Sequence, residues 1–292
     1  MKKPGLVSVV TATYNMGDYI AETLDSILGQ DYPDVESIVI DDGSTDHTSE
    51  VLARYADDPR VRVVRQENAG QTVAKNRGIA ESQGEFIAFC DADDTWVPHK
   101  LSRQLPRFAD PEVAVVYSDI NCIDGAGADL DQATMDKFEG RITGPLLIDN
   151  FVHFPTVVVR ADVLEEVNGF DESLTMSIDY DLWLRISVKY KFALVREKLA
   201  NYRIWEGQMS KKEGERLENF FRLLRRFEAK YPDAAAPAEK RRAWAHVHIT
   251  RGSWHERNGR KGAAARDYWK SMTLNPFHAG LWRRIVRLAV RG

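Results

Sequence analysis

Residues 85–94 read Glu85-Phe86-Ile87-Ala88-Phe89-Cys90-Asp91-Ala92-Asp93-Asp94, an apolar run that ends in a cluster of carboxylates. Such a short run of aromatic and aliphatic side chains is typical of a strand buried inside a sheet. In an extended chain residues i and i+2 point the same way, so Asp91 and Asp93 can face one ligand. The sequence therefore predicts a buried strand that brings two carboxylates to one site.

Two earlier apolar segments follow the same design. Residues 6–12 lead into Thr13 and Tyr14, and residues 37–40 lead into Asp41 and Asp42. Segments with the apolar spacing of amphipathic helices lie between the strand patterns, from Asp18 to Leu28 and from about Thr72 to Ser82. This alternation predicts an α/β fold, Rossmann-like, with a mostly parallel sheet covered by helices on both faces.

The polar clusters after these strands are candidates for one binding site. In parallel sheets a ligand binds beyond the carboxyl ends of the strands, so we expect the three clusters to converge. Clustered carboxylates repel one another unless a cation lies among them, and oxygen ligands favour Mg²⁺ or Mn²⁺. The alternative is structural: Asp94 caps the following turn and Asp91 lies in solvent.

The cluster after the second strand can recognise a nucleoside. A carboxylate at Asp42 can accept hydrogen bonds from a base or a ribose, and Gly43 lets the backbone approach closely. Tyr14 could stack on a base. The alternatives are a cap at Asp42 or Ser44 for the next helix and ordinary packing of Tyr14 at the strand end.

Composition limits the class of protein. The 292 residues are 43% hydrophobic and 29% charged, which excludes disorder and a polytopic membrane protein. Two cysteines, Cys90 and Cys122, cannot form a disulfide framework, and we expect reduced thiols in a cytoplasmic protein. The apolar run after Lys2 and Lys3 is interpreted as the first strand and not as a secretion signal.

Charge divides the chain. Residues 1–221 hold 23 basic and 39 acidic side chains, whereas residues 222–292 hold 17 and 5. We expect one domain over residues 1–210 and a basic helical subdomain over residues 211–292. Residues 119–150, rich in Asp and Gly, are expected to form a loop-rich insertion near the site. The aromatic residues of 240–270 are interpreted as the core of the subdomain, so no nucleic-acid partner is predicted.

The last segment has the pattern of an amphipathic basic helix. Its apolar positions are Leu281, Ile285, Leu288 and Ala289 with Trp282 beside them, and its charges are Arg283, Arg284, Arg287 and Arg291. A basic helix with a tryptophan can lie in the headgroup region of a membrane, which would make the protein peripheral on the inner face. The alternative is that the stripe packs on the acidic part of the protein.

Four segments together resemble the family 2 glycosyltransferases: Val7–Asn15, Ile38–Asp46, Ala74–Ala80 and Gly84–Asp94. The resemblance covers residues 6 to about 210, with the motifs in the family's order. It implies the GT-A fold, in which a nucleotide-binding half (1–118) is joined to an acceptor-binding half (119–210).

The resemblance also implies roles for individual residues. Thr13, Tyr14 and Asp42 correspond to residues that bind the base, and Lys75 stands where the family has an arginine. Asp93 would hold the metal that bridges the donor diphosphate. Asp91 is expected beside the ribose and near the metal.

A second motif lies on the acceptor side. The segments Phe170–Leu174 and Asp179–Arg185 resemble it, which implies that Asp179 is the general base. The residues alone favour the alternative, in which Asp179 is an N-cap and Asp181 a surface charge. Besides Lys75, two residues depart from the family pattern: Ile178 replaces a glutamate, and Trp205 replaces a histidine often found near the metal or the phosphates.

These features predict a metal-dependent, inverting glycosyltransferase that moves a sugar from a nucleotide-sugar donor, UDP-sugar by family frequency, to a hydroxyl. The expected acceptor is a saccharide or a lipid-linked saccharide in surface polysaccharide or glycolipid assembly. One alternative is a catalytically silent carbohydrate- or lipid-binding homologue, which Ile178 and Trp205 favour. Another is a sugar nucleotidyltransferase, but residues 11–17 contain a single glycine and no basic residue.

Overall fold

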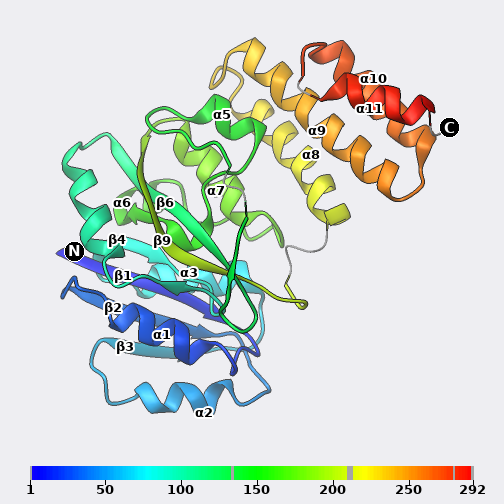
Figure 1. Ribbon diagram of the computed structural model, residues 1–292. Coiled ribbons are helices and arrows are strands. Elements are labelled where there is room, and N and C mark those ends of the chain that lie inside the picture. The colour runs from blue at the N-terminus through cyan, green and yellow to red at the C-terminus, as the bar shows by residue number, and fades with distance from the viewer. Residues whose placement is uncertain (1, 133–134, 209–212, 279, 291–292) are drawn as a thin grey trace. The chain divides into compact units, whose positions relative to one another are not determined.

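The structure is a computed structural model and describes residues 2–132, 135–208, 213–278 and 280–290, except the side chains of residues 289 and 290. The chain forms two compact units. The sheet unit comprises residues 1–141 and 151–208, and the helical unit comprises residues 142–150 and 209–292. Figure 1 shows the strands in the first and the α8–α11 helices in the second.

The sheet unit is built on one mixed sheet with the order β3-β2-β1-β4-β8-β6-β9-β5, and β7 pairs with β6. The strands are β1 (Lys3–Thr13), β2 (Val35–Asp41), β3 (Val61–Arg65), β4 (Gly84–Phe89), β5 (Thr95–Trp96), β6 (Val113–Asp124), β7 (Asp129–Leu130), β8 (Val158–Arg160) and β9 (Lys191–Ile204).

The strands expected to be parallel are parallel. β1 lies between β2 and β4, with Val9 opposite Ser37 on one side and Ala88 on the other, and β3 follows β2 in the same direction. Beyond β4 the sheet is mixed, because β8 runs antiparallel to both β4 and β6. Only three residues form β8, too few for the sequence pattern to indicate a direction.

Helices cover the parallel strands on both faces. Ile20, Leu24 and Ile27 of the first helix are buried in one core cluster with Val7 and Val9, as their spacing predicts. Ala74 packs on Ile38 and Ile40 in a separate cluster. The helices of this unit are α1 (Ile20–Leu28), α2 (Thr48–Leu52), α3 (Gln71–Glu81), α4 (Lys100–Gln104), α6 (Ala161–Glu166) and α7 (Ile178–Ser187). Short 3-10 helices span Ala53–Tyr55, Leu105–Ala109 and Phe154–Thr156.

The segment expected as a loop-rich insertion is more regular than predicted. β6 continues to Asp124, paired in parallel with β9 from Ile120 opposite Ala200 to Asp124 opposite Ile204. Residues 143–148 form a helix that belongs to the helical unit. Polar residues such as Asn121 interrupt the apolar pattern of this strand, so pairing with β9, a distant partner, decides its length.

The helical unit consists of α5 (Thr143–Ile148), α8 (Glu213–Lys230), α9 (Pro237–Arg257), α10 (Lys261–Leu274) and α11 (Leu281–Val290). Its α5 contacts α9, with Leu146 and Leu147 buried. No helix in the described ranges is both long and apolar enough to span a bilayer. The division of residues 1–210 into a nucleotide half and an acceptor half stays a prediction.

The predicted stripe of α11 packs inside the helical unit. Leu281 is fully buried, and Ile285 and Leu288 pack against the core cluster that Leu281 forms with Ile249, Ala264 and Tyr268. Arg287 pairs with Glu256 at 2.8 Å. The stripe is therefore a packing surface and is not available as the membrane-facing side. Peripheral membrane contact stays a prediction, in which the exposed Trp282 and Val286 would be the apolar contacts. The side chain of Ala289, and Arg291 altogether, lie outside the described residues.

Candidate active site

The predicted convergence of the polar clusters is confirmed. Thr13 at the end of β1 lies opposite Asp41 at the end of β2. On the other side of β1, the Cys90 N–H donates to the Val10 carbonyl at 3.3 Å, so β4 ends at the same edge. Since Asp91 follows Cys90 directly, the three clusters share the carboxyl edge of the parallel strands.

The loops after β1 and β2 are hydrogen-bonded to each other. Asn15, in the left-handed region at φ 55°, donates its N–H to Ser44 Oγ at 3.0 Å and accepts the Thr45 N–H through Oδ1 at 2.7 Å. Tyr14, which follows the last residue of β1 and precedes Asn15, is 45% exposed. Thr13 is buried, and its hydroxyl has no hydrogen-bond partner in the described part of the chain. A rigid edge thus carries an accessible ring and an unsatisfied hydroxyl, and the base-binding roles of both residues stay predictions.

Asp42 holds the next loop in place. Its carboxylate accepts the N–H groups of Ala69 and Gly70, each at 2.9 Å, and the Gln66 side-chain amide at 2.7 Å. Gly43 has φ 79°, and a Cβ there would lie 2.9 Å from the Asn68 nitrogen. Asp42 therefore fixes the entry to α3, a role that sequence reasoning missed because its partners lie 24 to 28 residues away. Its contact with a nucleoside stays a prediction.

The structure brings Lys75 and Asp91 together. Lys75 Nζ lies 2.9 Å from Asp91 Oδ1 and 4.0 Å from the centroid of the Phe154 ring. The lysine side chain is only 5% exposed, whereas the Asp91 side chain is 34% exposed. This buried cation offsets one of the clustered carboxylates and leaves it accessible to a ligand.

Asp93 is held by neutral donors. The indole N–H of Trp205 donates to Asp93 Oδ2 at 2.7 Å, and Gln208 Nε2 reaches the same oxygen at 3.5 Å. Burial and then the neighbouring Asp91 raise the pKa of Asp93, although these hydrogen bonds act in the opposite direction. Sequence reasoning treated Trp205 only as a missing histidine, whereas here it supplies a donor to the predicted metal ligand.

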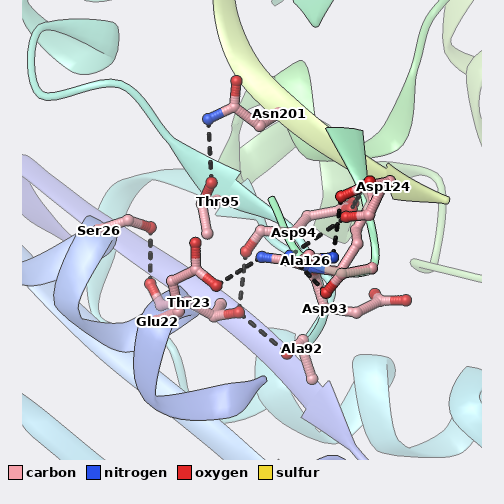
Figure 2. A network of polar contacts seen from close by, with 12 residues as sticks. Glu22, Thr23, Ser26, Ala92, Asp93, Asp94, Thr95, Asp124, Ala126 and Asn201 are labelled. Atoms are coloured by element: carbon pink, nitrogen blue, oxygen red, sulfur yellow. Dashed lines mark hydrogen bonds and ion pairs between the residues drawn. The ribbon is translucent and has the colours of Figure 1, made fainter. Parts of the chain in front are cut away.

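Arg203 fixes the backbone of this loop. Its Nε donates to the Asp93 carbonyl at 2.8 Å and its backbone N–H to Asp94 Oδ1 at 2.9 Å. Its guanidinium also pairs with Glu22 of α1 at 2.6 Å and reaches the Asp124 carbonyl at 3.4 Å. Figure 2 shows how residues of α1, the Asp93–Asp94 segment and the end of β6 meet here.

The donor set fits a cation completed by a ligand. In the described residues no group of three or more His, Cys, Asp or Glu side chains is arranged to hold a metal ion by itself. Lys75 compensates Asp91, and the charge of Arg203 acts on Asp94. For Asp93 the described residues provide no ion pair with a cationic side chain. A divalent cation on oxygen ligands, with open positions for phosphate oxygens, suits this arrangement.

On the acceptor side, Asp179 lies in the first turn of α7 and is partly exposed. Asp181 forms an ion pair with Arg185 at 2.7 Å, and Arg185 also donates to the carbonyls of Val167 and Gly169 at 2.7 Å each. Asp181 is thus engaged with Arg185, which holds the segment after α6 to α7, and the role of Asp179 as the general base stays a prediction. Ile178 is 3% exposed, so it belongs to the core and does not offer a surface to an acceptor.

Helix α3 links the two sides of the site. Thr72 Oγ1 donates to the Leu174 carbonyl at 2.7 Å. Asn76 both donates to the Phe170 carbonyl and accepts the Phe170 N–H, each at 2.9 Å. The same helix carries Lys75, which binds Asp91. The segment before Asp179 is therefore tied to the element that contacts the carboxylate cluster.

Comparison with known proteins agrees with this geometry. The family model "Glycosyl transferase family 2" matches residues 8–167. An uncharacterized glycosyltransferase of Nostoc sp. is 32% identical over 212 residues, which cover 68% of this chain and 64% of that protein. TuaG of Bacillus subtilis, named for teichuronic acid biosynthesis, is 35% identical over 176 residues, 60% of this chain and 62% of TuaG. The chain thus spans slightly less than two thirds of these relatives.

Solved structures share the fold. S. aureus TarS 1–349 in complex with UDP-GlcNAc has a TM-score of 0.68 at 21% identity, covering 91% of this chain and 81% of TarS 1–349. The mannosyltransferase PcManGT from Pyrobaculum calidifontis, in complex with GDP-Man and Mn²⁺, has a TM-score of 0.66 at 20% identity, covering 97% and 79%. At these identities the likeness shows the GT-A fold alone. The family model, in contrast, covers more than half of the chain and includes the motifs at the carboxyl edge of the sheet. The protein therefore belongs to glycosyltransferase family 2.

Proposed function

We propose that this protein is a metal-dependent, inverting glycosyltransferase that moves a sugar from a nucleotide-sugar donor, most simply a UDP-sugar, to a hydroxyl group. The observation that carries the proposal is the carboxylate cluster at the sheet edge, where Asp91 has Lys75 as partner and, among the described residues, Asp93 has only neutral side-chain donors. The UDP-GlcNAc bound to TarS and the GDP-Man bound to PcManGT support a nucleotide-sugar donor.

In this proposal Asp93, with Asp91 beside it, would hold Mn²⁺ or Mg²⁺, as the Mn²⁺ in PcManGT supports. The bound cation would neutralise the charge that develops on the leaving diphosphate. Lys75 is close enough to the cluster to add positive charge on the same side. Trp205 keeps Oδ2 of Asp93 engaged and so orients the carboxylate.

Asp179 would take the proton of the attacking hydroxyl. A sugar hydroxyl ionises far above neutral pH, so a carboxylate within hydrogen-bond reach must accept its proton as the new bond forms. A single displacement from the face opposite the leaving group inverts the anomeric carbon. The ties between α3 and residues 170–174 hold the segment that precedes Asp179 against the donor side.

The acceptor in this proposal is a saccharide or a lipid-linked saccharide of a surface polysaccharide or glycolipid, and the name of TuaG supports the polysaccharide context. A lipid-linked acceptor would place the reaction on the cytoplasmic face of a membrane, where the protein would be peripheral.

The test is a donor-hydrolysis assay over a panel of nucleotide sugars, run with Mn²⁺, with Mg²⁺ and with EDTA. We expect metal-dependent release of one nucleoside diphosphate, which Asp93→Ala abolishes while the far-UV spectrum is retained. Release of pyrophosphate would indicate a nucleotidyltransferase. Metal-dependent donor binding without turnover, even with a panel of saccharide acceptors, would indicate a catalytically silent homologue.

A further inference from the structure

The helical unit contains a hollow that the transfer reaction does not use. It has a volume of about 330 Å³ and opens between α8 and α9. Its lining consists of Glu218, Phe221, Arg222, Arg225, Arg226 and Arg251. Four of these six side chains carry guanidinium groups, and residues 222–292 hold 17 basic and 5 acidic residues.

The spacing along α8 explains why the arginines share one surface. Arg222, Arg225 and Arg226 are separated by three and four positions, so they lie on one face of the helix. Like charges at this spacing destabilise a helix by a few tenths of a kcal/mol per pair. An arrangement that is unfavourable for the helix alone becomes favourable once an anion lies between the guanidinium groups.

Arg251 enters from α9 in a fixed orientation. Its Nε and one terminal nitrogen donate to the two oxygens of Asp267 at 2.9 and 2.8 Å, and its guanidinium carbon lies 3.9 Å from the centroid of the Phe221 ring. Its other terminal nitrogen lies 3.5 Å from Glu218. Asp267 and Glu218 thus offset part of the charge and hold this wall of the hollow rigid.

Two arginines of the lining keep a charge that no described carboxylate offsets. In the described part of the helical unit, neither Arg222 nor Arg225 makes an ion pair with a carboxylate, and both are exposed. Even with Arg226 left aside, Arg222, Arg225 and Arg251 outnumber Glu218 in the lining and Asp267 behind it, so the hollow is positively charged. This contrasts with the acidic cluster at the sheet edge, where an anion needs a metal ion in order to bind.

We propose that this hollow is a metal-independent binding site for a phosphate-bearing group with more than one negative charge, such as a diphosphate. A guanidinium fork matches phosphate oxygens in a bidentate way, and several forks favour a multiply charged group over a single carboxylate. The volume is at the lower end of ligand pockets, enough for a diphosphate with part of its attached group. Lipid headgroups and soluble phosphate esters share this chemistry.

The test uses the full chain, inorganic pyrophosphate as the probe, and EDTA throughout to remove metal ions. Calorimetric titration at low salt should show binding that weakens as salt is added. Arg222→Ala combined with Arg225→Ala should lower the affinity at least about tenfold, since two charge-assisted contacts are removed. Arg241→Ala combined with Arg242→Ala, on the exposed face of α9, is the matched control, because it removes the same charge outside the hollow.

A second arm separates the two sources of phosphate. Vesicles of phosphatidylglycerol and phosphatidylcholine are sedimented with the wild type and both double variants. Loss of vesicle binding in the Arg222/Arg225 variant alone identifies a lipid headgroup, and unchanged vesicle binding with lost pyrophosphate binding identifies a soluble ester. Equal pyrophosphate affinity in the wild type and the Arg222/Arg225 variant, equal losses in both double variants, or no binding of either probe overturns the proposal.

Discussion

Replacing Trp205 by Phe tests how the chain prepares its predicted metal ligand. The indole N–H donates to Asp93 Oδ2 at 2.7 Å, and the Trp205 ring lies 5.7 Å from the Tyr19 ring, centroid to centroid. Phenylalanine keeps an aromatic ring for this packing but removes the donor. We expect Trp205→Phe to weaken the metal-dependent binding of UDP while the fold is retained.

The structure sets the size of the effect. Hydrogen bonds to charged groups contribute about 1.5–3 kcal/mol, and loss of an outer partner of a metal ligand typically costs about 10- to 100-fold in affinity. The second donor to the same oxygen, Gln208, lies at 3.5 Å, the limit of a hydrogen bond. Gln208→Ala should therefore cost much less than Trp205→Phe, and this ordering follows from the two distances.

The assay is calorimetric titration of UDP into each variant at saturating Mn²⁺ and again in EDTA. We expect a loss of about 10- to 100-fold for Trp205→Phe with Mn²⁺ and no change in EDTA, because the tryptophan acts through the metal ligand. Wild-type affinity of Trp205→Phe with Mn²⁺ would refute the reasoning. An equal loss in EDTA would assign Trp205 to the nucleotide itself.

Three other substitutions probe separate parts of the molecule. Asp179→Asn should lower kcat by about 10²- to 10⁴-fold with unchanged UDP affinity, and near-normal turnover would remove Asp179 from the base role. Burial, opposed by nearby Cys90, lowers the pKa of Lys100 to about 7, so the folded state holds fewer protons than the unfolded state above that pH. Urea unfolding should therefore show stability rising by about 2 kcal/mol from pH 7 to pH 9, a rise that Lys100→Met abolishes. Burial raises the pKa of Asp267, but hydrogen bonds from His248 and Arg251 outweigh it and lower the pKa to about 2. The ionised Asp267 carboxylate therefore stabilises the fold by about 2 kcal/mol above about pH 4. Unfolding measured at decreasing pH should show that the wild type loses this stability as the pH falls to about 2, whereas Asp267→Asn lacks it at every pH.

The parallel half of the sheet could be predicted because its signal is local. The apolar runs of β1, β2 and β4 are buried on both faces, so each reads as a continuous apolar segment without reference to the rest of the chain. The second half of β6 could not be predicted, because its polar residues pair with β9 some 80 positions later. Local pattern identifies a fully buried strand, whereas an amphipathic strand depends on its partner.

The candidate site shows the same division. Asp91, Asp93 and Asp179 could be located from short motifs, but their partners come from distant segments. Trp205 is 112 residues from Asp93, and Glu22 is 181 residues from Arg203. A side chain that departs from a family pattern can be identified from sequence, but the group that it contacts cannot. The replacement of a histidine by Trp205 indicated a loss, and the structure shows a hydrogen-bond donor in its place.

The three carboxylates of Asp91, Asp93 and Asp94 differ in how their charges are balanced, and this difference favours a different role for each. Lys75 already offsets Asp91, so a second cation on Asp91 gains less than a cation on Asp93, whose side-chain donors within the described ranges are all neutral. Asp94 is fully buried, and its Oδ1 accepts the backbone N–H of Arg203, so this carboxylate is suited to holding the loop. The balance of charge thus argues for Asp93 as the principal metal ligand. It also argues for Asp91 as an acceptor of hydrogen bonds from the ribose of the sugar donor, because Lys75 forms an ion pair with this carboxylate.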